Sequence, residues 1–400
     1  MKVIERKYLL PFALVTSLFA LWGLANNMTD TLLAAFRKIM QMSDTQTSFI
    51  QMAFYGAYFC LALPAALFIR KNSFKSGVIL GLALYAAGAI MFLPAARIES
   101  YAFYLIAIYV LAAGCSVLET AANPYIMSMG SPETATRRLN IAQSFNPIGS
   151  ILGILVSKYF ILQDISLYSV SGTYTAVGCV LLGIMAVMLF AHMPEGRETT
   201  KQDSLKATFR RLLKNKLYVW GVVAQFFYVG AQICVWSFTI RLVMKELGYV
   251  ESQAATLYLV SIIGFCSSRF VYTWLMKYVA PQRLLAIGSV LSAVCALLVV
   301  LTGGWTAVVA LILVSVFMSL MFPTIYGIAL GGISCEGCAG DEKIGASGLI
   351  MAILGGALLT PVQGLVSDHS NINLSYLVPL VCFAVVLGYA LFAAKSQKSS

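Results

Sequence analysis

The chain has 400 residues, of which 60% are hydrophobic and only 11% are charged, and its mean hydropathy is +0.85. A soluble domain usually carries about 25% charged residues, so this composition excludes a soluble globular enzyme and indicates that most of the surface faces lipid. The net charge of +11 does not indicate nucleic-acid binding, because the basic residues are spread over short segments between apolar runs.

The apolar runs have the length of membrane-spanning helices. A bilayer core about 30 Å thick needs about 20 helical residues, and a spanning segment must satisfy its own backbone hydrogen bonds. The first run lacks a small-residue cleavage pattern, so it is predicted to be a span and not a removed signal peptide. We predict an all-α membrane protein whose twelve transmembrane helices lie at 8–36, 47–69, 76–95, 101–130, 139–162, 173–193, 217–240, 252–276, 283–302, 305–333, 344–367 and 373–394.

One strongly polar stretch, residues 194–216, divides these helices into two sets of six, in residues 1–193 and 217–400. With the N-terminus in the cytoplasm, most Lys and Arg residues fall on the cytoplasmic side, as the positive-inside rule requires. Both termini are therefore predicted to be cytoplasmic. Residues 204–216 of the polar linker fit a basic helix on the membrane surface or a solvated connection, and the sequence leaves both interpretations open.

The two halves look like repeats. The Ala-Asn-Pro-Tyr stretch at 122–125 in the fourth span corresponds to Met-Phe-Pro-Thr at 321–324 in the tenth. The stretch at 147–149 in the fifth span corresponds to 354–356 in the eleventh. Two six-helix pseudo-repeat halves joined by a linker are the plan of the major facilitator superfamily, whose carriers bind substrate near the midplane between the halves.

Asp30, Glu119 and Arg269 are the charged residues that fall clearly inside predicted spans. A charge at the bilayer centre costs at least about 2.5–3.5 kcal/mol, so each of these residues is expected to have a functional or structural role. Asp30 lies in the outer part of the first span and is either a proton-handling group or an interfacial carboxylate. Desolvation favours the neutral form of Glu119, which suits it to proton uptake and release, although a structural role is the alternative. Arg269 has no acidic neighbour in sequence, and it is expected either to extend its charge toward the membrane surface or to hold a helix–helix contact.

Uncharged polar residues form two stripes, each on one helix face. The stripes are Asn140, Gln143 and Asn146 in the fifth span, and Gln225, Tyr228, Gln232 and Trp236 in the seventh. Amides can donate to and accept from sugar hydroxyls, and aromatic faces can cover the C–H surface of a sugar. Together with Asn27 and Asn123 they would surround one cavity, whereas hydrogen bonding between helices is the alternative.

The sequence predicts no cofactor and no metal. Most of the nine cysteines sit singly in spans, where Cys behaves as a small hydrophobe. Cys335 and Cys338 form a CxxC pair in a loop, but the two histidines, His192 and His369, lie near opposite membrane faces and cannot complete a site. There is no phosphate-binding loop, no dinucleotide fingerprint and no catalytic Ser/His/Asp set, so we predict neither an enzyme nor ATP-driven transport.

Several of these stretches carry a family resemblance. They are LWGLANN at 21–27 with Asp30, LETAANP at 118–124, RLNIAQSFN at 138–146, AQFFYVGAQ at 224–232, PTI at 323–325 and TPV at 360–362 with Ser367 and Asp368. In these residues the chain resembles the fucose:proton symporter family of the major facilitator superfamily. That family includes bacterial L-fucose permeases and related glucose/galactose and N-acetylglucosamine carriers.

The resemblance implies proton-coupled import of a monosaccharide across the bacterial inner membrane by alternating access. By that analogy Glu119 couples proton and sugar movement, and Asp30 takes part in proton transfer. Asn27, Gln143 and Asn146 would contact the sugar. The expected partners are therefore a monosaccharide, a proton and the lipid bilayer, with no nucleic acid, and the carrier is expected to be a functional monomer.

One departure from the family pattern leaves the exact sugar open. Fucose permeases have Gln-Tyr before the Pro-Thr of the tenth span, where this chain has Met321 and Phe322, so a hydroxyl is lost at a predicted cavity position. An uncoupled or sodium-coupled carrier is the alternative function, since Asn26, Asn27 and Asp30 could supply oxygen ligands to sodium. A nutrient sensor is a remote alternative, because no signalling domain is visible.

Overall fold

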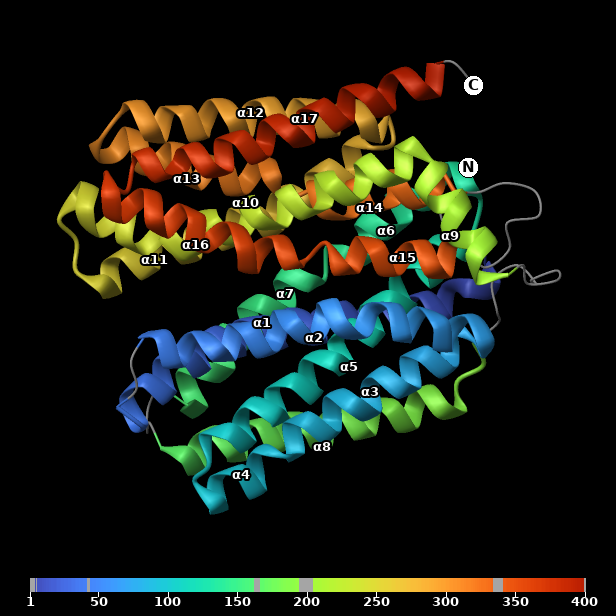
Figure 1. Cartoon of the computed structure of the whole chain (residues 1–400), viewed down its shortest axis with the longest axis horizontal. Helices are drawn as coiled ribbons and strands as arrows, with labels where there is room; N and C mark the ends of the chain where they lie inside the picture. Colours follow the sequence, from blue (N-terminus) through green and yellow to red (C-terminus); the bar gives the residue numbers. More distant parts are fainter. Residues whose placement is uncertain are drawn as a thin grey trace. The chain divides into compact units, whose positions relative to one another are not determined.

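The structure is a computed structural model that describes residues 4, 6–41, 44–161, 166–193, 204–333 and 341–398. Within these ranges every regular element is a helix (Figure 1). Twelve helical segments are long and apolar enough to cross a membrane, and they overlap all twelve predicted spans. The protein is therefore an all-α, multi-pass membrane protein, as predicted.

The first six spans are formed by α1 (Leu9–Ile39), α2 (Asp44–Lys71), α3 and α4 (Phe74–Ile90 and Phe92–Ile98), α5 (Tyr101–Ser128), α6 and α7 (Ala135–Gln143 and Asn146–Val156) and α8 (Leu167–Phe190). The short helix α9 (Leu205–Lys214) comes next. The last six are α10 (Lys216–Leu247), α11 (Glu251–Leu275), α12 (Pro281–Leu301), α13 and α14 (Gly304–Met318 and Met321–Gly331), α15 and α16 (Asp341–Met351 and Leu354–His369) and α17 (Leu377–Lys398).

Polar residues at the start of helices explain why the connections are short. Ser73, Ser100, Ser166 and Ser204 each accept a hydrogen bond from the backbone N–H three residues later, at the first turns of α3, α5, α8 and α9. Such N-caps satisfy a backbone donor that the helix itself leaves unpaired. The C-terminal end of α10 is fixed in a different way. This helix stops at Gly248, which takes the left-handed conformation (φ +65°) that glycine adopts without strain.

Four spans predicted as single helices are broken. The fifth is interrupted between α6 and α7, the tenth between α13 and α14, the eleventh between α15 and α16, and the third between α3 and α4. Pro147 and Pro323 follow the first two breaks, and a proline inside a helix removes one hydrogen bond and crowds the preceding turn. The prediction of continuous helices at 76–95, 139–162, 305–333 and 344–367 is therefore wrong in this respect.

The chain forms two compact units. Unit 1 contains Met1–Pro132, Phe145–Gln202 and Ala339–Met351, and unit 2 contains the remainder of the chain. Consequently α6 belongs to unit 2 although α7 belongs to unit 1, and α15 belongs to unit 1 although α16 belongs to unit 2. The predicted halves, 1–193 and 217–400, describe the repeat in the sequence, whereas these units describe which helices pack together.

Close helix contacts at glycine recur in both units. In unit 1 a side chain at Gly149 of α7 would collide with the backbone of Ala20 in α1. In unit 2 a side chain at Gly355 of α16 would collide with the backbone of Phe226 in α10. Small residues allow such close approach in membranes. The fifth span thus packs on the first as the eleventh packs on the seventh, which is the correspondence expected of the two repeats.

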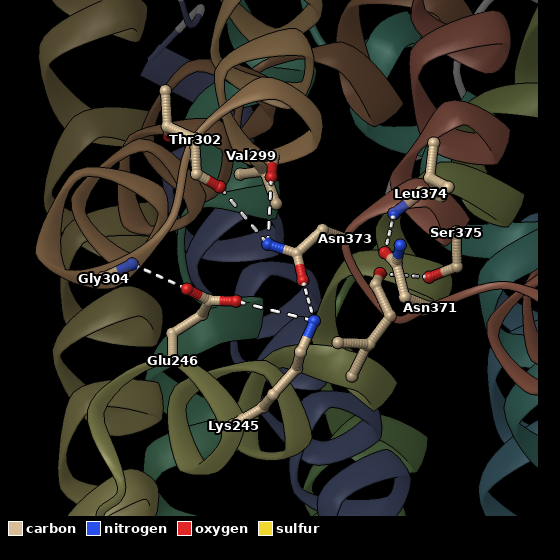
Figure 2. Close-up of polar contacts among 10 residues, drawn as sticks. Lys245, Glu246, Val299, Thr302, Gly304, Asn371, Asn373, Leu374 and Ser375 are labelled. Atoms are coloured by element: carbon tan, nitrogen blue, oxygen red, sulfur yellow. Dashed lines mark hydrogen bonds and ion pairs between the residues drawn. The ribbon is translucent and has the colours of Figure 1, made fainter.

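A polar cluster ties together the loops at one end of unit 2 (Figure 2). Lys245 Nζ in the last turn of α10 donates to Asn373 Oδ1 at 2.7 Å. The Asn373 amide nitrogen in turn donates to two backbone carbonyls at the end of α12, both at 3.3 Å. Glu246 Oε2 accepts the backbone N–H of Gly304, the first residue of α13, at 2.6 Å. The α12–α13 and α16–α17 connections, far apart in sequence, are therefore both fixed to the end of α10.

Candidate functional site

Glu119 lies in α5, a largely buried helix of unit 1. Its side chain is only 5% exposed, and Asn123, one turn later, is fully buried. Tyr58 of α2 and Cys115 of α5 are close enough to interact with Glu119 electrostatically. Over the described part of the chain, no ion pair or hydrogen bond holds the Glu119 carboxyl. A carboxyl in this environment has no fixed donor to stabilise its charge, so it can bind and release a proton.

Asn27 and Asn146 meet around Gly23, where α7 approaches α1. A side chain at Gly23 would collide with the backbone of Asn146, and the Gly23 carbonyl accepts a hydrogen bond from Asn27 Nδ2 at 3.2 Å. Asn146 Nδ2 donates to the carbonyl of Phe19 at 3.2 Å. The Asn146 amide therefore joins α7 to α1, which was the alternative to sugar binding, whereas this hydrogen bond of Asn27 lies within α1. Asp30 lies further along α1, but its side chain is outside the part of the structure that is described.

Unit 2 contributes amides and aromatic rings from α10 and α14. Gln225 is fully buried, and among the described residues neither its amide nitrogen nor its amide oxygen has a hydrogen-bond partner. The ring of Phe322 lies 6.4 Å from that of Tyr228 and 6.4 Å from that of Tyr326. Gln232, two turns beyond Gln225, is half-buried. A buried amide beside aromatic faces is the combination that a sugar ring requires.

The predicted stripe of the fifth span is divided between the two units. Asn140 and Gln143 lie in α6, which packs on α14 in unit 2, and Asn140 Nδ2 donates to Thr324 Oγ1 at 3.3 Å. Asn146 lies in α7 of unit 1. The prediction that all three amides share one face of one helix is wrong, because the helix breaks ahead of Pro147.

Arg269 makes a helix contact, which was one of the two roles that the sequence left open. The side chain is 3% exposed, and its guanidinium lies 4.6 Å from the centre of the Phe265 ring. Nη1 donates to the carbonyl of Gln143 at 2.8 Å, and Nε donates to the carbonyl of Ser319 at 2.7 Å. These acceptors were not predicted from the sequence, although prolines four residues after Gln143 and Ser319 indicate that the two carbonyls need another donor.

The described residues provide no support for a metal site. Among the described residues there is no group of three His, Cys, Asp or Glu side chains that could hold a metal ion. The described cysteines are all free. Cys335 and Cys338 lie outside the described residues, so the role of the CxxC pair stays untested.

Two six-helix repeats, one with a buried carboxyl that no described residue pairs with and the other with buried amides and aromatic rings, define a secondary carrier. The family model of the Major Facilitator Superfamily matches residues 12–335. The chain therefore belongs to the major facilitator superfamily.

Its relatives confirm the resemblance to the fucose:proton symporter family. The chain is 40% identical to an L-fucose-proton symporter of Haemophilus influenzae, over 99% of both chains. It is 31% identical to a glucose/galactose transporter of Brucella abortus, over 98% of this chain and 96% of that protein. These relatives are carriers and not enzymes, in agreement with the prediction from sequence.

A solved structure confirms the fold. The chain matches the crystal structure of the major facilitator transporter FucP in the outward conformation with a TM-score of 0.88 and 35% sequence identity. The match covers 97% of this chain and 99% of the FucP chain. The agreement extends over both repeats, so the twelve-helix major facilitator fold applies to essentially the whole chain.

Proposed function

We propose that this protein is a proton-coupled symporter that imports a monosaccharide across the bacterial inner membrane by alternating access. The buried carboxyl of Glu119, to which no described residue donates a hydrogen bond, is the observation that carries the proposal. The relatives named as an L-fucose-proton symporter and a glucose/galactose transporter support a hexose as the substrate class. We place both termini in the cytoplasm and regard the monomer as the functional unit.

Burial explains how proton and sugar movement can be coupled at Glu119. An ionised carboxylate without a partner is costly in a medium of low dielectric, so the carrier favours a protonated Glu119 while the site is closed to water. If the site opens to either side of the membrane in turn, the proton is taken up where its concentration is high and released where it is low. Asp30 would pass the proton to or from the outer side.

The sugar would bind between the amides and aromatic rings described above. We assign Asn27, Asn123, Gln143, Asn146, Gln225, Tyr228, Gln232 and Phe322 to this site. The amides would bind the hydroxyls, and the rings of Tyr228 and Phe322 would cover the apolar face of the sugar. L-Fucose, galactose, glucose and N-acetylglucosamine are the candidates.

Uptake into proteoliposomes tests the proposal. Labelled L-fucose, galactose, glucose and N-acetylglucosamine are offered with and without an inward proton gradient of one pH unit. Such a gradient supplies about 1.4 kcal/mol per proton, enough for about tenfold accumulation at one proton per sugar. We expect one of these sugars to accumulate inside the vesicles. The protons that enter with it should make the outside medium more alkaline.

The variant Glu119→Gln separates binding from coupling. The amide has the shape of the protonated acid but cannot release a proton, so we expect exchange of labelled for unlabelled sugar to persist while gradient-driven accumulation is lost. Glu99→Gln, at an exposed position after α4, is the matched control and should behave as wild type. Two results would refute proton coupling through Glu119. One is accumulation that depends on a sodium gradient and not on the proton gradient, and the other is gradient-driven accumulation by Glu119→Gln.

A further inference from the structure

Two prolines leave backbone carbonyls without their helical donors. In an α-helix the N–H of each residue donates to the carbonyl four residues earlier. Pro147 and Pro323 have no N–H, so the carbonyls of Gln143 and Ser319 cannot be satisfied within the fifth and tenth spans. Both carbonyls lie at the C-terminal ends of helices, α6 and α13, where the helix dipole adds negative potential. In a membrane interior such groups require another donor.

Arg269 supplies both missing donors. Its Nη1 binds the Gln143 carbonyl and its Nε binds the Ser319 carbonyl, at 2.8 Å and 2.7 Å. The planar guanidinium can hold two acceptors in a fixed geometry, and the Phe265 ring beneath it restricts its rotation. Two helix C-termini can together compensate the buried positive charge, which explains why no carboxylate pairs with Arg269 in the described part of the chain.

The two carbonyls flank residues of the proposed sugar site. Gln143 itself carries one candidate side chain, and Phe322 lies between Ser319 and Pro323 with its ring beside Tyr228. We propose that Arg269 is a positioning residue, which fixes the broken ends of α6 and α13 and thereby orients Gln143 and Phe322 toward the sugar. This inference rests on the proposed function, since it names the sugar as the ligand that these side chains meet.

Restoring the missing N–H groups tests the inference. Arg269→Met is expected to raise the apparent KM for the transported sugar about tenfold or more, because small displacements of binding groups are costly. Adding Pro147→Ala and Pro323→Ala returns an N–H to each orphaned carbonyl, so the triple variant should recover a large part of the affinity. A role limited to overall stability would change the amount of folded carrier and Vmax but not KM.

Two further variants complete the design. Arg269→Lys keeps the charge but offers no planar pair of donors, so it should resemble Arg269→Met. Arg241→Met removes an exposed arginine that also lies over a phenylalanine ring (Phe238, 5.5 Å), and it should leave KM unchanged. If Arg269→Met does not fold, recovery of folded protein in the triple variant becomes the readout.

The outcomes separate this inference from the proposed function. Wild-type vesicles that transport no monosaccharide refute the proposed function. Wild-type transport with an unchanged KM in Arg269→Met, or full activity of Arg269→Lys, refutes the positioning role. A triple variant no better than Arg269→Met also refutes it, since Arg269 would then act through its charge or by touching the sugar itself.

A second inference comes from the short helix α9, which has three distinct faces. Thr208 and Leu212 are buried against unit 2. The exposed surface carries an apolar stripe of Leu205, Phe209 and Leu213 and a basic stripe of Lys206, Arg210 and Lys214. Each stripe repeats every four residues, and at about 100° per residue the two lie side by side. Leu213 is 72% exposed, so the apolar stripe is not covered by the protein.

The junction with α10 places this helix at a membrane boundary. Asn215 ends α9 and caps α10, accepting the N–H of Tyr218 at 3.1 Å and donating to the carbonyl of Gly332 at 2.7 Å. Trp220, exposed at the beginning of α10, is the residue type enriched where lipid meets water. We infer that α9 binds anionic phospholipid, with the apolar stripe among the acyl chains and the basic stripe on the headgroups.

Lipid-dependent stability of the full-length protein tests this second inference. Phosphatidylglycerol added to the detergent-solubilised protein should raise its unfolding temperature more than phosphatidylcholine does. The triple variant Lys206→Gln, Arg210→Gln, Lys214→Gln should lose that preference. The variant Lys277→Gln with Arg283→Gln, at two exposed positions between the end of α11 and the first turn of α12, should keep it. An equal response of the wild type to both lipids, or an unchanged preference in the triple variant, would refute the inference.

Discussion

Replacing Glu246 should destabilise unit 2 through the first turn of α13. The Glu246 carboxylate accepts the N–H of Gly304 at 2.6 Å, and it lies 3.7 Å from Lys245 Nζ (Figure 2). The carboxylate therefore acts in two ways, as a charged cap at a helix N-terminus and as one member of an ion pair. Glu246→Gln removes the charge and keeps an acceptor oxygen, whereas Glu246→Ala removes both.

The two contributions differ in size because the two side chains differ in exposure. Glu246 is only 11% exposed, so its interaction with the α13 dipole should be worth about 1–2 kcal/mol. Lys245 is 48% exposed, and water and salt screen the ion pair to about 0.5 kcal/mol or less. Loss of the charge-assisted hydrogen bond adds about 1.5–3 kcal/mol, part of which water recovers. We expect Glu246→Gln to cost about 1–2 kcal/mol and Glu246→Ala about 2–4 kcal/mol.

A thiol-reactive dye can measure this ranking, because Cys234, Cys295 and Cys382 are buried in unit 2 and react only on unfolding. The unfolding temperature should fall most for Glu246→Ala, less for Glu246→Gln and least for Lys245→Met. High salt should reduce the effect of Lys245→Met and leave most of the effect of Glu246→Ala. If Lys245→Met proves as harmful as Glu246→Ala, the ion pair dominates and the argument from the helix cap is wrong.

Three further predictions follow from single contacts. Gly149→Ala should lower the unfolding temperature strongly because its methyl group would meet the backbone of α1, whereas Gly183→Ala, with open space around it, should be neutral or slightly stabilising. Phe322→Tyr restores a hydroxyl at the proposed site and should raise the ratio of L-fucose to galactose uptake, measured in competition; an unchanged ratio would place Phe322 away from the sugar. Lys343→Met should destabilise unit 1, since Lys343 Nζ binds the carbonyl of Ile69 at 3.2 Å, and Lys343→Arg should restore stability in the same dye assay.

The positions of the spans could be predicted because membrane insertion depends on hydrophobicity summed along a local stretch of chain. All twelve predicted spans are confirmed, and so are the correspondence of the fifth span with the eleventh and the family. The helix breaks were not predicted, although Pro147 and Pro323 were visible. A proline in a span can kink a helix or end it, and neighbouring helices decide which.

The candidate site was only partly predictable for a related reason. The burial of Glu119 follows from its position in a long apolar run, and the structure confirms that burial. The partners of Asn146 and Arg269 lie on helices far away in sequence, which no local pattern specifies. Amides that bind helices and amides that bind a sugar have the same composition and spacing, so their separate roles stay a prediction until transport is measured.

The passage of α6 into unit 2 and of α15 into unit 1 resembles domain swapping within a single chain. If the gene were divided in the polar linker, each fragment would carry a half-helix that belongs to the other compact unit and would lack one of its own. The two fragments should therefore fold well only when they are made together, each completing the other. A conventional two-domain protein, cut at its linker, would give two pieces that fold independently.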